Sequence, residues 1–226
     1  MAWVFVGIPA WYTNPMQNLG EDILLLAIEQ NGTIALRNKM HFALAGSELE
    51  LLAALRRVDV VKGRIVVIDP TPTRDPLLDG AFSSMRASKR PPRARDWIAR
   101  QKATVTGEYL NRMAASGAVR YETRRRLGLF RAQRWFIGDF ARLNWLRSQL
   151  DAIAFSSGPV DAMQAAFGGL VHAIGLSALL YPRGDGRPAR KRLRSLAQYS
   201  HGAVAVTDAL RARQAAATAA AITAGS

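Results

Sequence analysis

The sequence of 226 residues contains no cysteine, and this absence removes several kinds of chemistry. Without thiols there is no disulfide framework, no thiolate metal site and no cysteine nucleophile. Histidine is scarce too: the three histidines, at positions 41, 172 and 201, have no acidic residue at metal-ligand spacing. We interpret His172, which lies in an apolar stretch, as a hydrogen-bonded core residue. The sequence therefore predicts no metal site and no other cofactor.

Motifs that carry catalysis are missing as well. The sequence has no glycine-rich phosphate loop, no Gly-x-Ser-x-Gly nucleophile turn and no pair of carboxylates spaced to share one face. Its 17 acidic residues are too scattered for a general acid and a general base to be assigned. We therefore predict a binding protein without catalytic residues, and not an enzyme.

Acidic residues are few in the C-terminal part of the chain, which makes the charge uneven. Residues 84–226 contain 24 basic and 8 acidic groups, whereas residues 1–83 contain 7 basic and 9 acidic groups. The formal net charge of the whole chain is +14. A field of this sign attracts polyanions, which means nucleic acid or an anionic membrane surface. An arginine-rich genome composition is the alternative explanation of the same excess.

The N-terminal stretch lacks the features of a targeting signal. It is apolar but has no basic group, includes Pro9 and shows no small-residue cleavage site, so a secretory signal peptide is not indicated. We expect residues 1–17 to lie outside the fold, either as translated leader or as a membrane-touching tail. Residues 18–226 are expected to form one domain, and the protein is expected to be cytoplasmic.

The sequence does contain apolar residues at regular intervals, and most of these intervals are typical of helices. The organising segment is residues 160–181, which follow Pro159, carry Asp161 in the first turn and end before Pro182. Its apolar residues run almost all the way round, which predicts a helix buried among other helices. At about 1.5 Å per residue, a membrane span is the alternative. Three glycines in it indicate close approach of neighbouring helices: Gly168, Gly169 and Gly175.

Other segments predict further helices and two hairpins. Helices are expected over residues 20–30, 42–57, 76–87, around Trp97, 109–116, 139–156, 188–199 and from 203 onward. Two β-branched runs flank Lys62-Gly63 and predict a tight hairpin, and a second hairpin with an arginine tip is expected over residues 118–134. The predicted fold is mainly α, a single globular helical domain around a central hydrophobic helix with two short β-hairpins.

The helix at 109–116 and the hairpin after it have the outline of a winged helix. This outline and the basic C-terminal part motivate an alternative function, a nucleic-acid-binding module. A recognition helix needs basic and amide side chains, and here only Asn111 and Arg112 qualify. Nucleic acid is therefore the less favoured partner.

A set of short motifs, in unbroken order from about residue 18 to the C-terminus, forms a recognisable pattern. The most distinctive piece is the connector Asp69-Pro70-Thr71-Pro72-Thr73, followed by Leu77-Leu78-Asp79. The others are the Leu-Leu-Leu-Ala run of the first helix, Phe42 to Gly46, Ser88 to Pro91, Asp96-Trp97, Ser116 to Val119 and Leu127 to Phe130. The ordered set resembles the Golgi phosphoprotein 3 family in its bacterial form. The resemblance implies a mostly helical domain around a central hydrophobic helix. It also implies binding of phosphatidylinositol 4-phosphate, as in the eukaryotic members.

The headgroup site that the resemblance implies is not matched residue by residue. The family's tryptophan, its arginine nine residues later and its Arg-x-x-Arg pair fall on Leu36, Ala45, Ala103 and Thr106. Basic residues lie next to these positions, and converging donors can hold a phosphate in more than one arrangement. We expect an anion site built from these neighbours: Arg37, Lys39, Arg100 and Lys102.

The hairpin corresponds in position to the one through which the family inserts into membranes or self-associates. The resemblance implies membrane contact through Arg124, Arg125, Arg126, Leu129 and Phe130. For Leu129 and Phe130 the alternative is burial as strand core. The sequence thus predicts a non-catalytic adaptor on the inner face of the membrane, which binds anionic lipids and can self-associate through the hairpin. It does not indicate a protein partner.

Overall fold

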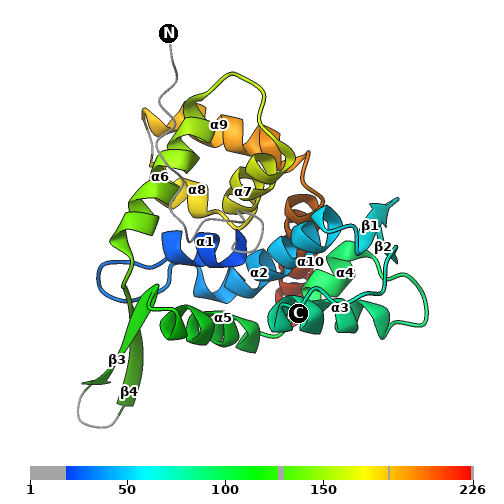
Figure 1. The fold of residues 1–226 in the computed structure, drawn as a ribbon, viewed down its shortest axis with the longest axis horizontal. Coiled ribbons are helices and arrows are strands. Elements are labelled where there is room, and N and C mark those ends of the chain that lie inside the picture. Colours follow the sequence, from blue (N-terminus) through cyan, green and yellow to red (C-terminus); the bar gives the residue numbers. More distant parts are fainter. Residues whose placement is uncertain (1–18, 127–129, 183, 225–226) are drawn as a thin grey trace.

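The computed structural model describes residues 19–126, 130–182 and 184–224, and within these ranges the chain is mainly helical. The helices are α1 (Leu19–Leu26), α2 (Arg37–Ala54), α3 (Pro76–Arg86), α4 (Ala94–Ala99), α5 (Thr104–Ala115), α6 (Phe140–Phe155), α7 (Ala162–Ala173), α8 (Leu176–Leu180), α9 (Gly186–Ala197) and α10 (His201–Ala224). Two antiparallel strand pairs accompany them: β1 (Val58–Val61) with β2 (Arg64–Val67), and β3 (Val119–Arg126) with β4 (Phe130–Ile137). Figure 1 shows both strand pairs at the periphery of the helical body.

Two helices occupy the centre of this body. α2 is buried throughout residues 40–49 and packs against α1, α5, α7 and α10. α7 is buried throughout residues 165–171 and packs against α2, α6, α9 and α10. The expected mainly α fold around a central hydrophobic helix is confirmed, with α7 as that helix. Within the described residues, no helix combines the length and the hydrophobicity that a membrane span requires.

The prediction of one continuous helix over residues 160–181 is wrong. α7 ends at Ala173 and α8 begins at Leu176, because Gly175 adopts a φ of 90°, the left-handed conformation that interrupts a helix. The other two glycines do mark close helix packing. A Cβ on Gly168 would lie 2.8 Å from Leu193 Cδ2, and one on Gly169 would lie 2.9 Å from the Cα of Ala197, both on α9.

Local caps explain why several helices begin where they do. Asp75 precedes α3, and its side chain accepts hydrogen bonds from the backbone N–H groups of Leu77 (2.9 Å) and Leu78 (3.2 Å). Pro76 then occupies the first helical position, where its missing N–H costs least. Asp161 and Gln164 form a reciprocal capping box at the start of α7. These starts agree with the sequence-based expectations.

α2 and α10 approach closely at a pair of glycines. A Cβ on Gly202 would lie 2.3 Å from the carbonyl oxygen of Gly46, and one on Gly46 would lie 2.7 Å from Val206 Cγ2. Glu50 of α2 accepts hydrogen bonds from Ser200 Oγ at 2.7 Å and from the backbone N–H of Gly202 at 2.5 Å. The Glu50 side chain therefore stabilises the start of α10, because the free backbone N–H groups at the beginning of a helix attract negative charge.

Both predicted hairpins are present. Lys62 and Gly63 join β1 to β2 with φ values of 51° and 73°, the two left-handed residues of a type I′ turn. The register of β3 and β4 places Val119 opposite Ile137 at the base and Arg126 opposite Phe130 at the far end. Figure 1 shows this second hairpin projecting away from the helices.

Candidate anion-binding pocket and hairpin

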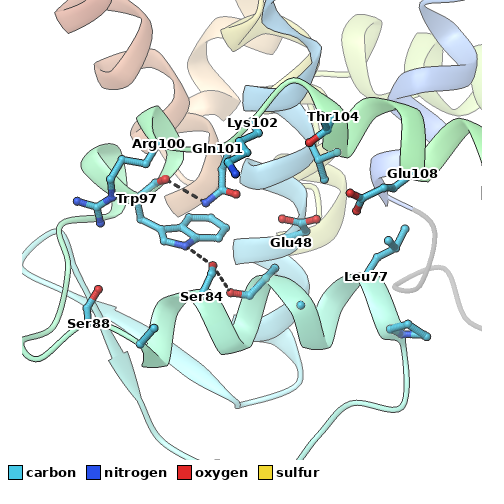
Figure 2. Close-up of a pocket in the computed structure, with 15 residues that line it drawn as sticks. Glu48, Leu77, Ser84, Ser88, Trp97, Arg100, Gln101, Lys102, Thr104 and Glu108 are labelled. Carbon is cyan, nitrogen blue, oxygen red and sulfur yellow. Dashed lines mark hydrogen bonds between the residues drawn. The ribbon is translucent and has the colours of Figure 1, made fainter.

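A pocket of about 490 Å³ lies between α3, α4 and α5, with Glu48 of α2 among its lining residues (Figure 2). Trp97 forms one wall, and its Nε1 donates a hydrogen bond to Ser84 Oγ at 2.9 Å. Gln101 Nε2 in turn donates to the carbonyl oxygen of Trp97 at 3.1 Å. The wall is therefore held in place by hydrogen bonds between α3, α4 and the segment that follows α4.

Two cations stand on the rim of this pocket. Arg100 and Lys102 belong to the short link between α4 and α5, and both are exposed. The link is tight, because the backbone N–H of Arg100 donates to the carbonyl of Trp97 at 3.2 Å and that of Gln101 donates to Ile98 at 3.1 Å. Both positive charges therefore come from one short segment whose backbone is hydrogen-bonded to α4.

The lining of the pocket includes a buried acid, Glu48, which has 2% of its surface exposed. The hydroxyl of Tyr109 donates to its Oε1 at 3.2 Å. Burial raises the pKa of Glu48 from 4.5 to about 8, and the hydrogen bond from Tyr109 offsets only part of this. The group is therefore neutral at pH 7. A neutral carboxyl group can donate as well as accept a hydrogen bond, and it does not repel an anion.

The structure places the four predicted headgroup residues in two regions. Arg100 and Lys102 line the pocket, whereas Arg37 and Lys39 lie in the first turn of α2 and are not among its lining residues. Lys39 is half-buried, with its Nζ 4.0 Å from the point where a Cβ on Gly175 would stand. Lys39 precedes Glu48 by nine residues on α2, about 13 Å along the helix axis.

The positions that correspond to the family's own headgroup residues do not provide charges here, and two of them are core positions. Ala45 is 1% exposed and Thr106 is 6% exposed. The Oγ1 of Thr106 is also buried without a hydrogen-bond partner among the described residues. The charges of an anion site in this region would therefore have to come from neighbouring positions.

A buried ion-pair network, which the sequence did not reveal, joins α1 to α5 and α6. Arg142 donates to Asp22 Oδ1 at 2.7 Å and to Glu21 Oε2 at 3.2 Å. Arg112 donates to Glu21 Oε1 at 2.7 Å and to Asp75 Oδ2 at 2.8 Å. Burial raises the pKa of Asp22 to about 6, although Arg142 acts in the opposite direction. Arg112 is therefore a structural residue and is engaged by two carboxylates.

Two acidic residues of α1 belong to this network, but their position in the chain also fits a simpler explanation. Glu21 and Asp22 lie in the first turn of α1, where acids favour the helix dipole. However, all eight residues of α1 are buried, so these two acids have no solvent-facing side to occupy. Charged residues inside such a helix need buried partners, and Arg142, 120 residues after Asp22, could not be paired with it from the sequence.

The β3–β4 hairpin is anchored at its base and exposed farther out. Val119, Trp135 and Ile137 are buried, and the backbone N–H of Trp135 donates to the carbonyl of Gly32 at 2.8 Å. Tyr121 is 59% exposed and lies against the ring of Trp135, with 5.6 Å between the centroids. Of the residues expected to contact membrane, Leu129 lies outside the described residues. The others are described by their backbone alone, in the strands: Arg124, Arg125, Arg126 and Phe130.

One of the three histidines, His172, takes part in a local hydrogen bond. His172 is half-buried, and its Nδ1 lies 3.2 Å from Ser177 Oγ, which confirms the interpretation as a hydrogen-bonded residue of the helical core. Burial, and after it the positive charge of Arg194, lowers the pKa of His172. Among the described residues, no group of three or more His, Asp or Glu side chains is arranged to hold a metal ion.

A known protein family matches most of this chain. The family model for Golgi phosphoprotein 3 (GPP34) matches residues 19–213, from the start of α1 into α10. No curated protein sequence gives a significant match. The matched segment includes the pocket, the ion-pair network and both hairpins. The chain therefore belongs to the Golgi phosphoprotein 3 family.

Proposed function

We propose that this protein is a peripheral membrane protein that binds anionic phospholipid headgroups and has no catalytic role. The observation that carries the proposal is the pocket whose lining combines Arg100 and Lys102 with the buried Glu48, whose pKa burial raises to about 8. Membership of the Golgi phosphoprotein 3 family supports the same function. By resemblance to the eukaryotic members, the headgroup is phosphatidylinositol 4-phosphate, and the inner face of the membrane is the place of action.

The chemistry of the pocket suits a phosphorylated polyol. The two rim cations pair with the phosphate, and Glu48 and Gln101 offer hydrogen bonds to hydroxyl groups. The basic surface adds a less specific attraction, because each lysine or arginine near an anionic membrane contributes about 1 kcal/mol. Arg37, Lys39 and the arginine-rich strands of the β3–β4 hairpin are proposed as further lipid contacts, and the hairpin also as a site of self-association.

Three matched double variants test where the headgroup binds, each removing one arginine and one lysine. They are Arg100→Ala with Lys102→Ala, Arg37→Ala with Lys39→Ala, and Arg187→Ala with Lys191→Ala on the exposed side of α9. Arg190 is unsuitable as a control, since its guanidinium group donates to the backbone carbonyls of Tyr181 and Pro182. Co-sedimentation with vesicles that contain phosphatidylinositol 4-phosphate is the measurement, with neutral vesicles alongside.

We expect R100A/K102A to weaken vesicle binding at least about tenfold, since two charges that contribute about 1 kcal/mol each are lost. The α9 control is expected to lose less than about threefold, because only screened, long-range attraction is removed. Equal losses in all three double variants would show a diffuse basic surface instead of a pocket. Equal recovery on neutral vesicles, or no binding to either kind, would contradict lipid-headgroup binding altogether.

The nucleic-acid alternative has lost one of its two supporting residues. Arg112 is held by Glu21 and Asp75, which leaves Asn111 as the exposed candidate on α5. A duplex-DNA mobility-shift assay at physiological salt separates the two functions. DNA binding without vesicle binding would replace the lipid proposal.

A further inference from the structure

A second hollow, of about 510 Å³, lies between the β1–β2 turn, the start of α4 and the start of α10. It shares no lining residue with the pocket described above. Figure 1 shows β1 and β2 at the edge of the molecule, beside α4. We call this hollow the β1–β2 groove, and its lining residues are Val60, Lys62, Gly63, Arg64, Arg93, Ala94, Arg95, Gln198, His201, Val204, Ala205 and Asp208.

The lining of the groove is strongly positive. Lys62, Arg64, Arg93 and Arg95 face one acidic residue, Asp208. Asp208 is itself 3.7 Å from Arg211, and Arg95 pairs with Asp96 at 3.1 Å. Among the described residues, neither Lys62 nor Arg93 makes a hydrogen bond or an ion pair through its side chain. Two cations are therefore available for a ligand.

The backbone forces two of these cations together. Arg64 and Arg93 are partners in an isolated antiparallel bridge, which is held by hydrogen bonds from Ile65 N to Pro92 O and from Ala94 N to Gly63 O, each 2.9 Å long. Residues directly opposite each other in such a bridge project their side chains to the same face, and like charges there are destabilising. Arg64 meets part of this cost by donating to the carbonyl of Pro91 at 2.8 Å. A bound anion would relieve the remaining repulsion.

The groove also has room and an apolar part for more than a bare phosphate. Val60, Ala94, Val204 and Ala205 contribute hydrocarbon surface, and Gln198 supplies a polar amide. A volume of about 510 Å³ is within the range of small-molecule sites in proteins. The combination matches an ester in which a charged group joins a compact organic moiety.

We propose that the β1–β2 groove binds a phosphate ester with at least two negative charges, held by Lys62, Arg64 and Arg93. Guanidinium groups match the oxygens of a phosphate in a bidentate manner, and a phosphate monoester near pH 7 carries more charge than one carboxylate. A free ester and the headgroup of a phosphorylated lipid share this chemistry. The groove and the proposed headgroup pocket are separate sites, so this inference does not rest on the proposed function.

The test uses inorganic pyrophosphate as the probe, without lipid, in isothermal titration calorimetry at constant ionic strength. The variant is Lys62→Gln with Arg93→Gln, which removes the two cations of the groove whose side chains have no partner among the residues that the structure describes. Its matched control is Arg187→Gln with Lys191→Gln on α9. We expect K62Q/R93Q to bind pyrophosphate at least about tenfold more weakly than the natural sequence, because two charge-assisted contacts are lost. The control is expected to change the affinity less than about twofold.

The outcomes distinguish binding in the groove from unspecific attraction by the basic surface, and they test this inference apart from the proposed lipid binding. Equal losses in both double variants, or heats no larger than those of sodium chloride, would overturn the inference. If K62Q/R93Q fails to fold, Arg93→Gln alone and Lys62→Gln alone are compared with Arg187→Gln and Lys191→Gln, and the same two results decide. Vesicle sedimentation identifies the source: a parallel loss of vesicle binding in K62Q/R93Q assigns a lipid headgroup, and unchanged vesicle binding assigns a free ester. Failure of all vesicle binding would contradict the proposed function and leave the calorimetric result standing.

Discussion

Glu48 has a buried carboxyl group in the candidate pocket, and its protonation makes the free energy of unfolding depend on pH. Its pKa rises from 4.5 to about 8 on folding, because burial disfavours the carboxylate. Between these two values the folded protein keeps a proton that the unfolded chain has released. The stabilising contribution is therefore full below pH 4.5 and is lost as the pH rises towards 8.

The variant Glu48→Gln keeps an acceptor for the Tyr109 hydroxyl and removes the titration. We expect the free energy of unfolding of the natural sequence to fall between pH 5 and pH 8 by about 3 kcal/mol more than that of E48Q. Urea unfolding at the two pH values measures this difference. Glu108→Gln, which changes an exposed acid that lines the same pocket, is the control and should stay close to the natural profile, because the charge of Glu108 is only a minor cause of the raised pKa of Glu48. The same flattening in both variants would exclude Glu48 as the cause.

Arg142 supports a different prediction, on the ion-pair network. Its guanidinium group is buried and binds both Asp22 and Glu21, so Arg142→Ala leaves two buried carboxylates with less compensation. We expect R142A to lower the free energy of unfolding by about 3–5 kcal/mol. Arg147→Ala, at an exposed position of the same helix, should change it by less than about 0.5 kcal/mol. Chemical denaturation checks both, and comparable small effects would show that the network contributes little.

For individual residues, the sequence predicts contacts between neighbours in the chain and misses contacts between residues that are far apart in it. The starts of α3 and α7 are predicted to within two residues, because Asp75 and Asp161, which cap them, are adjacent to these helices in the chain. The pairing of Asp22 with Arg142 depends on how α1 meets α6, and nothing within a few residues of either one records that contact. The burial of Glu48 is equally a result of three helices closing over it.

The elements themselves were largely predictable, and the main error lies at one glycine. The helices, the caps and both hairpins follow from hydrophobic period and turn residues. Gly168, Gly169 and Gly175 were all interpreted as packing positions, yet Gly175 has a φ of 90° and separates α7 from α8. Glycine permits both roles, so residue type alone does not distinguish close packing from a left-handed break.

Two other glycines give a paired prediction on helix packing. Gly202→Ala places a Cβ against the backbone of α2, where a rigid carbonyl stands 2.3 Å away, and we expect a loss of about 1–3 kcal/mol in the free energy of unfolding. Gly107→Ala, in the interior of α5, meets no atom within 4 Å, and we expect a gain of about 0.5–1 kcal/mol. Thermal unfolding followed by circular dichroism measures both. Changes of the same sign in the two variants would contradict the close approach of α2 and α10.

At the scale of the whole molecule, the sequence identifies the basic residues, but it predicts less well which of them line the same pocket. Arg100 and Lys102 share a short link, so they line one pocket together, as two neighbours in sequence readily do. Whether Arg37 and Lys39 reach the same ligand depends on where α2 crosses α5, which hydrophobic pattern does not specify. The β1–β2 groove likewise arises where three segments distant in the sequence converge.

The ion-pair network has a consequence for the order in which the chain is made. Glu21 and Asp22 are synthesised before their partner Arg142, which follows Asp22 by 120 residues. At about 5–20 residues per second, roughly 6 to 24 s pass before Arg142 is synthesised. During that interval α1 can bury its leucines only together with Asp22, whose cationic partner has not yet been made. Stalled nascent chains that end at residue 138 should therefore be cleaved by protease within α1 and α2, and those that present the full sequence should resist. Until Arg142 is made, we therefore expect the N-terminal segment to depend on chaperones that hold unfolded chains.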